Sequence, residues 1–216
     1  KWLFEKITKK KIKNKKVKWI KNFKTIKKGP VIFFGNEFFD AIPIKQFLRK
    51  NGTIEEKCYS VNKNGLRETF KDATVNDKIE INSYKALGNI EFIEFPKLGF
   101  IELRKIVKKI STHSGGILLI DYGYINSINK NTLQTVMNNK KENMSKFLDN
   151  MGKADITYLV NFSLLKEYFI NQKLSVKKIV SQKFFLERMG IIERAEILKK
   201  KLNSKQKHYM SITLMR

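Results

Sequence analysis

Short apolar runs separated by amphipathic stretches are the main pattern along this chain. Residues 31–34 (Val-Ile-Phe-Phe) form a continuous apolar run after a Gly-Pro pair, and residues 117–120 (Ile-Leu-Leu-Ile) form another after a Gly-Gly pair. Runs of this length are typical of parallel strands that are buried on both faces. We therefore predict two central strands, each followed at once by polar residues.

The remaining pattern predicts strands that alternate with helices. Further strands are predicted at 17–20, 90–95 and 175–180, a short helical or extended piece at 44–48, and helices at 100–111, 163–171, 184–189 and 193–202. In the first of these helices Ile101, Ile106, Val107 and Ile110 are expected to share one apolar face. This alternation favours an α/β fold, with a mostly parallel sheet between helices and a ligand crevice at the carboxyl ends of its strands.

Two segments interrupt the alternation, and we expect both to lie outside the central sheet. Residues 50–82 hold two Asn-Gly turn signals between alternating segments, which predicts a β-hairpin insertion. Residues 124–155 are polar and rich in Asn and Lys, which predicts a surface excursion or lid. Residues 1–216 are otherwise interpreted as a single, partial domain. The chain begins within a helical pattern and stops within an apolar segment, so we expect it to be incomplete at both ends.

The charge of the chain raises the question of nucleic acid. Its 216 residues include 45 Lys plus Arg and 20 Asp plus Glu, a formal net charge of +25. Most of the excess is Lys and is spread along the chain, whereas phosphate-reading sites favour the Arg fork. We therefore favour a solvated surface over nucleic-acid binding, with the Lys-rich stretch 9–18 as the one candidate anion-facing patch. No apolar run approaches the ~18 residues that a membrane span needs.

Metal and disulfide chemistry is not favoured by the composition. Cys58 is the single cysteine, and His113 and His208 are the only histidines. These residues supply neither a disulfide nor a set of metal ligands. We predict no metal site and expect a reducing compartment.

The first polar segment after a central strand is the strongest candidate site. It contains Asn36, Glu37 and Asp40 together with Phe38 and Phe39. Polar groups at a buried strand end are costly unless they bind something, and a carboxylate beside aromatic faces can orient an amine nucleophile. In the alternative interpretation, Asn36 and Asp40 cap the local turn while the two phenylalanines fill the core.

The second central strand ends on Asp121, Tyr122 and Gly123. The carboxyl-end rule makes Asp121 a second site candidate at the same edge of the sheet. A strand-ending Asp before a turn Gly is an equally good structural explanation.

These segments resemble the MidA family of S-adenosylmethionine-dependent methyltransferases. The resemblance rests on Gly-Asn-Glu-Phe-Phe-Asp-Ala-Ile-Pro-Ile at 35–44 and Gly-Gly-Ile-Leu-Leu-Ile-Asp-Tyr-Gly at 115–123. Further matches follow in the same order at 132–134, 152–162 and 182–195, so the resemblance covers about 17–202. The chain departs from the family pattern at Tyr124, Asn139, Met151 and Asn161, where His, His, Pro and Asp are usual.

The resemblance implies a fold, a cofactor and a partner. The fold would be that of a Rossmann-like class I methyltransferase, and the cofactor would be S-adenosyl-L-methionine. A mitochondrial relative is a protein arginine methyltransferase needed to assemble respiratory complex I, so the implied partner is an arginine-bearing protein resembling an NADH dehydrogenase subunit. We favour the bacterial cytoplasm as the location, or the mitochondrial matrix if the source is eukaryotic.

The resemblance also implies roles for individual residues. Asn36, Glu37 and Asp40 would be catalytic; Phe38, Phe39, Asp121 and Tyr122 would bind substrate; Gly35 and Asn36 would lie beside the cofactor. The family's main Gly-rich cofactor loop and ribose-binding acid have no counterpart in this sequence.

Two alternatives remain open at the level of sequence. The chain could be a non-catalytic assembly or chaperone module that grips a partner protein with residues 124–155. It could instead be an RNA-directed methyltransferase or an RNA-binding domain, an idea that rests on the net charge of +25. The oligomeric state is not predicted.

Overall fold

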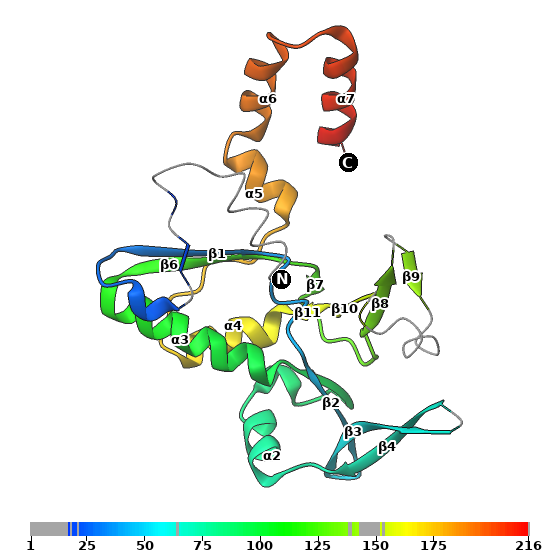
Figure 1. Cartoon of the computed structure of the whole chain (residues 1–216). Coiled ribbons are helices and arrows are strands. Elements are labelled where there is room, and N and C mark those ends of the chain that lie inside the picture. The colour runs from blue at the N-terminus through cyan, green and yellow to red at the C-terminus, as the bar shows by residue number, and fades with distance from the viewer. Residues whose placement is uncertain are drawn as a thin grey trace.

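The structure is a computed structural model that describes residues 17, 19–20, 22–63, 65–137, 140–142, 152 and 154–215. Its centre is a parallel pair of strands, β1 (Val31–Asn36) and β6 (Gly115–Ile120). In this pair Val31 lies opposite Gly115, and Asn36 lies opposite Ile120. Helix α3 (Lys97–His113) leads into β6 and lies along one face of the pair (Figure 1). Both predicted central strands are therefore confirmed.

One expectation about these strands is wrong, because β1 is not buried on both faces. Ile32 is 79% exposed and Phe34 is 65% exposed. Phe33 points the other way and meets Phe23 of the short 3-10 helix η1 (Phe23–Thr25) edge to face, with ring centroids 5.3 Å apart. Among the described residues, helix α3 and η1 cover one side of the pair, and the side that carries Ile32 and Phe34 stays open to solvent.

The predicted hairpins form a separate antiparallel sheet in the order β4-β3-β2-β5. Its strands are β2 (Lys45–Lys50), β3 (Thr53–Asn62), β4 (Gly65–Asp72) and β5 (Phe92–Phe95). Asn51 and Gly52 join β2 to β3 with φ values of +50° and +77°, as a type I′ turn requires. The predicted strand at 90–95 is thus a neighbour of β2 rather than of β1.

A helix and a helical turn lie between β4 and β5. Helix α2 (Val75–Asn82) occupies the end of the segment expected to be hairpins, and η2 (Lys85–Leu87) follows it. The piece at 44–48, for which helical and extended forms were both open, belongs to strand β2. The idea that 50–82 is an insertion into the fold stays a prediction.

Short strands follow β6 in the segment expected to be an excursion or lid. Strands β8 (Gln134–Met137), β9 (Lys140–Glu142) and β10 (Asp155–Thr157) form one antiparallel sheet, and β7 (Gly123–Tyr124) pairs in parallel with β11 (Val160–Asn161). Residues 138–139, 143–151 and 153 lie outside the described residues. The role of 124–155 as a lid therefore stays a prediction.

Four helices follow β11, and two of the predicted strands are absent. The helices are α4 (Phe162–Asn171), α5 (Gln182–Arg188), α6 (Ile191–Lys199) and α7 (Ser204–Met215). The first three confirm the predicted helices, and α5 to α7 project away from the central strands (Figure 1). The strand predicted at 175–180 is wrong, as is the one at 17–20 for its described residues, because neither segment pairs with any described strand.

A cluster of aromatic rings joins the central strands to the antiparallel sheet. Phe100 of α3 stacks on Tyr168 of α4 at 4.3 Å between centroids and meets Phe95 of β5 at 5.5 Å. Phe39, just after β1, lies 6.4 Å from the Phe100 ring. On α3 the predicted apolar face is correct except at Ile101, which is 43% exposed while Phe100 and Leu103 are buried.

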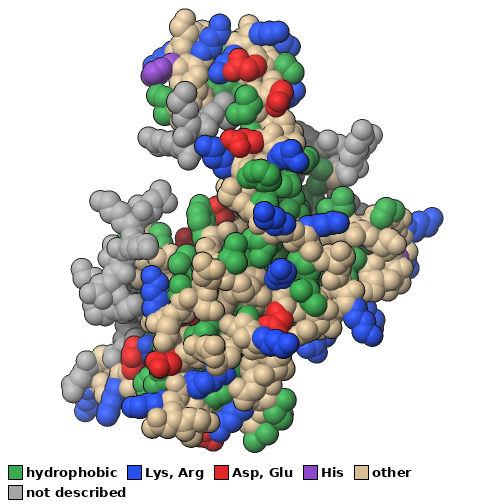
Figure 2. All heavy atoms as spheres, turned by 180° about the vertical axis from the view of Figure 1, so that it is seen from behind, with side chains coloured by type: hydrophobic (Ala, Val, Ile, Leu, Met, Phe, Trp, Pro, Cys, Tyr) green, Lys and Arg blue, Asp and Glu red, His purple; other side chains and the backbone are tan. Residues whose placement is uncertain are grey.

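On the face drawn in Figure 2, the positive charge is dispersed. Figure 2 shows Lys and Arg side chains scattered over one face, interrupted by hydrophobic and acidic ones. The candidate anion-facing patch at 9–18 falls outside the described residues apart from Val17. Within the described part of the chain, no helix combines the length and the apolar character that crossing a membrane requires.

Candidate functional site

The carboxyl ends of β1 and β6 bring the two candidate segments together, and we call this group of residues, 36–40 and 121–122, the acidic corner. Pairing of the strands continues beyond β1, since the Glu37 N–H donates to the Ile120 carbonyl at 2.9 Å. Glu37 then takes a φ of +46°, a left-handed conformation that is costly for a residue with a Cβ. The chain bends at this residue, directly after β1.

Asp121 holds the acidic corner together. Its Oδ2 accepts the N–H groups of Phe39 at 2.8 Å and Asp40 at 3.3 Å, and its Oδ1 accepts the N–H of Tyr122 at 2.9 Å. The sequence left open whether Asn36 and Asp40 cap this turn. In the structure the capping carboxylate is that of Asp121, which comes from the neighbouring strand.

Within the described part of the chain, the carboxylates of the corner have no ion-pair partner. Burial raises the pKa of Asp121, although backbone N–H donors, among them those of Phe39, Asp40 and Tyr122, act in the opposite direction. Burial also raises the pKa of Asp40, and the charges of Asp121 and Glu37 raise it further. Among the described residues, no Lys or Arg forms an ion pair with any of these three groups. The corner therefore groups three carboxylates that repel one another, an arrangement suited to a cation.

The aromatic residues of the corner divide between core and surface. Phe39 is 1% exposed and packs on α3, where a Cβ added at Gly99 would lie only 2.6 Å from Phe39 Cζ. Phe38 is 40% exposed and Tyr122 is 64% exposed, so both can meet a ligand. Gly35 lies inside β1, where an added Cβ would come within 2.9 Å of a Leu119 methyl group.

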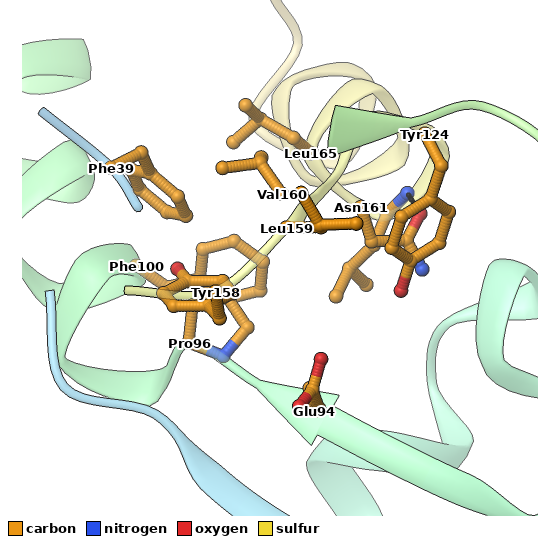
Figure 3. Close-up of a pocket in the computed structure, with 11 residues that line it drawn as sticks. Phe39, Glu94, Pro96, Phe100, Tyr124, Tyr158, Leu159, Val160, Asn161 and Leu165 are labelled. Carbon is orange, nitrogen blue, oxygen red and sulfur yellow. Dashed lines mark hydrogen bonds between the residues drawn. The ribbon is translucent and has the colours of Figure 1, made fainter. Parts of the chain in front are cut away.

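A small cavity of about 10 Å³ adjoins Phe39 of the corner and is otherwise lined by the end of β5, the start of α3, β7 and the segment 158–165. Figure 3 shows Phe39, Phe100 and Tyr158 on one side of it, Tyr124 on the other, and Glu94 below. Tyr158 is 4% exposed, and its hydroxyl has no hydrogen-bond partner within the described part of the chain. The sequence did not identify Tyr158 or Glu94 as candidates, because each comes near the corner only through long-range strand pairing.

Glu94 is buried and anchored by neutral donors. Its Oε1 accepts Gln46 Nε2 at 2.9 Å and the Thr132 N–H at 3.0 Å, and the Thr132 hydroxyl donates to its other oxygen. Thr132 Oγ1 in turn accepts the Leu159 N–H at 3.0 Å. The network fixes the antiparallel sheet to the segment that carries Tyr158.

Two departures from the family pattern have a structural explanation. Asn161 is the N-cap of α4 and accepts the Leu164 N–H at 3.0 Å, a role that the usual Asp would also perform. Tyr124 lines the cavity, and burial together with the charge of Glu94 raises its pKa to about 12. Asn139 and Met151 lie outside the described residues.

Similar proteins extend over most of this chain but continue well beyond it. A Caenorhabditis elegans protein named "Protein arginine methyltransferase NDUFAF7 homolog, mitochondrial" is 28% identical over 180 residues, which are 82% of this chain and 41% of that protein. The Danio rerio "Protein arginine methyltransferase NDUFAF7, mitochondrial" is 25% identical over 189 residues, with 83% and 42% covered. The chain therefore spans less than half the length of these relatives.

Solved structures share the fold. A likely methyltransferase of the COG1565 superfamily from Burkholderia thailandensis, bound to S-adenosyl-homocysteine, matches with a TM-score of 0.63 and 17% identity over 85% of this chain and 47% of that one. An uncharacterized protein of the same superfamily and organism matches with a TM-score of 0.67 and 16% identity over 87% of this chain and 50% of that one. The predicted Rossmann-like methyltransferase fold is confirmed.

The family is shown by a match over most of the chain. Residues 4–180 fit the model of a family described as "Putative S-adenosyl-L-methionine-dependent methyltransferase". This match confirms the family prediction made from 35–44 and 115–123, and both of those segments lie within it. The chain belongs to this family of S-adenosylmethionine-dependent methyltransferases.

Proposed function

We propose that the chain forms the acceptor side of an S-adenosylmethionine-dependent protein arginine methyltransferase. The observation that carries the proposal is the acidic corner, where Glu37, Asp40 and Asp121 face no counter-charge within the described residues. The printed names of the relatives support arginine as the acceptor. The activity would belong to the full-length protein, since the chain corresponds to about 41% of the nematode relative.

The corner fits one end of the cofactor. When bound, S-adenosylmethionine supplies a methyl group on a positively charged sulfur, and carboxylates that form no ion pair within the described residues suit that charge. Gly35 and Asn36 would border this end, at the last residues of β1. The described residues of the corner offer no cationic partner for the carboxylate end of the cofactor, so that end would be held elsewhere in the full-length protein.

The residues of the corner can position and deprotonate an arginine side chain. Glu37 and the Asn36 amide oxygen would accept guanidinium N–H groups, while Phe38 and Tyr122 would lie against the plane of the guanidinium. Methyl transfer is an in-line displacement, so alignment is the main contribution of the protein. The bound cofactor would supply the methyl group, and the accepting nitrogen would lose a proton on methylation. Asp40 can accept it, because its raised pKa makes it a stronger base than an ordinary carboxylate.

The partner proposed here is an arginine-bearing protein resembling an NADH dehydrogenase subunit. The support for a protein partner is the printed name of the relatives, which are mitochondrial proteins. The compartment of this chain stays a prediction, with the bacterial cytoplasm favoured and the mitochondrial matrix as the alternative.

The test is methyl transfer by the full-length protein to its partner, followed by mass spectrometry of methylarginine. Glu37→Gln should lower kcat/KM by about 100-fold, because one charged acceptor of the guanidinium is lost. Glu187→Gln on α5 is the matched control, since Glu187 is exposed and lies outside the corner, and it should keep normal activity. Normal methylation by Glu37→Gln would refute the catalytic role. Normal partner assembly by a protein unable to bind the cofactor would favour the non-catalytic assembly module.

A further inference from the structure

The hydroxyl of Tyr158 stands out because it is buried and has nothing to bind. Tyr158 is 4% exposed, and its Oη has no hydrogen-bond partner among the described residues. Buried polar groups in native proteins are almost always paired, so an unpaired one calls for a specific explanation. The comparison with Tyr168 is direct, since that tyrosine is 1% exposed and donates to the Phe100 carbonyl at 3.0 Å.

The surroundings of Tyr158 connect it to the acidic corner. Its backbone N–H donates to the Asp40 carbonyl at 3.3 Å, which ties the residue to the turn after β1. Burial raises the pKa of Tyr158, and the negative charges of Asp121, Asp40 and Glu94 raise it further. The hydroxyl therefore keeps its proton at neutral pH and can both donate and accept a hydrogen bond.

The size of the cavity limits what can enter it. Its volume of about 10 Å³ is room for one group of the size of a water molecule. An ammonium, or one amino group at the tip of a guanidinium, has this size, whereas a whole guanidinium does not. The rest of a guanidinium would stay outside, beside the carboxylates of the corner.

The charge of the surroundings favours a cation over an anion. Asp40, Asp121 and Glu94 all act on Tyr158, and within the described part of the chain none of them forms an ion pair with Lys or Arg. The hydroxyl oxygen can accept an N–H from a cationic group. An anionic group in the same place would meet like charges.

We propose that the cavity is the inner end of the acceptor site and that the Tyr158 hydroxyl binds one N–H of the cationic side chain. Tyr158 is then a specificity-determining residue that separates a cationic nitrogen from a neutral one. This inference rests on the proposed function for the nature of the ligand. It goes beyond that function in assigning a residue and a cavity outside the two predicted segments.

The experiment measures binding of two small probes to the full-length protein by NMR titration, without cofactor or partner. Methylguanidinium is the cationic probe, and methylurea is its neutral counterpart of similar shape. The wild type should bind methylguanidinium more tightly than methylurea. Tyr158→Phe should weaken methylguanidinium binding about tenfold, as expected for one lost hydrogen bond to a charged group.

Tyr168→Phe is the matched control, because it removes a buried hydroxyl that already has a partner. It should leave the binding of both probes unchanged. Urea unfolding separates binding from folding, since Tyr158→Phe should unfold at the same or a higher urea midpoint than the wild type, and Tyr168→Phe at a lower one.

Two results would overturn the inference. The first is wild-type affinity of Tyr158→Phe for methylguanidinium. The second is equal affinity of the wild type for the two probes, which would mean that the cavity does not select a cation. Methyl transfer by the full-length protein is assayed separately, so a failure of this inference is distinguishable from a failure of the proposed function.

Discussion

Two groups of carboxylates, one around the buried Asp77 and one in the acidic corner, differ in what surrounds them. Asp77, at the start of α2, is 1% exposed and pairs with two lysines, Lys45 at 3.0 Å and Lys97. The Thr74 hydroxyl donates to Asp77 at 2.9 Å, and the Asp77 N–H donates back to it at 3.1 Å. In the acidic corner, Asp121 accepts only backbone N–H groups among the described residues.

The difference appears in the direction of the pKa shifts. Burial alone would raise the pKa of Asp77, but hydrogen bonds from Lys97, Lys45 and Thr74 outweigh it and lower the pKa. In the corner burial prevails, and the pKa values of Asp40 and Asp121 are raised. A satisfied ion cluster such as that of Asp77 stabilises the fold, whereas carboxylates without an ion-pair partner among the described residues make the corner a candidate cation site.

The largest expected effect on stability is at Asp77. Asp77→Ala leaves Lys45 and Lys97 without their shared partner and removes the hydrogen bond that Thr74 donates. We expect the free energy of unfolding to fall by about 2–3 kcal/mol. Loss of a fully buried ion pair costs more, but the two lysine side chains remain 36% and 32% exposed. Urea unfolding at pH 7 measures the change.

Asp40→Asn is the counterpart in the corner and should leave stability equal to or slightly above that of the wild type. A raised pKa means that the native state binds protons more tightly than the unfolded state, so stability is lost as pH rises above 3.8. The advantage of Asp40→Asn should therefore grow from pH 4 to pH 7. The cost of Asp77→Ala should instead shrink as pH falls below 3.8, because the pKa of Asp77 is lowered. Equal losses in the two variants at pH 7 would contradict the comparison.

A smaller effect on the free energy of unfolding is expected at Gly99, which packs in the core against Phe39 of the corner. Gly99→Ala would press a methyl group into the Phe39 ring, 2.6 Å from Cζ, and should cost about 1–2 kcal/mol by overpacking. Gly116→Ala is the control, since its added Cβ meets nothing within 4 Å, and should stay within about 0.5 kcal/mol of the wild type. A Gly99→Ala protein as stable as this control would show that Phe39 can shift without penalty.

The sequence predicted the central strands and the position of the corner well, because both follow from local pattern and from the carboxyl-end rule. The apolar runs at 31–34 and 117–120 became β1 and β6, and their ends bring Glu37 close to Asp121. Local pattern does not show whether a strand-like segment has a neighbouring strand with which to form hydrogen bonds. The segment 175–180 has strand-like composition, but no described strand pairs with it.

The long-range contacts of the site could not be predicted from the sequence. Antiparallel pairing of β5 with β2 places Glu94 beside Gln46, residues that are 48 positions apart in the chain. The backbone N–H of Tyr158 donates to the Asp40 carbonyl, and this bond brings Tyr158 to the corner. Thr132 accepts the Leu159 N–H and donates its own N–H to Glu94, so it links the segment of Tyr158 to Glu94. Nothing in the spacing of these residues indicates that they meet.

The most direct test is a carbon-13 NMR titration of the aspartate side chains in the full-length protein, with and without methylguanidinium. The account predicts that Asp40 and Asp121 titrate above 3.8 and Asp77 below it, and that the probe lowers the pKa values of Asp40 and Asp121 while leaving Asp77 unchanged. If Asp40 and Asp121 instead titrate below 3.8, or do not respond to the cation, the acidic corner is not a cation-binding acceptor site.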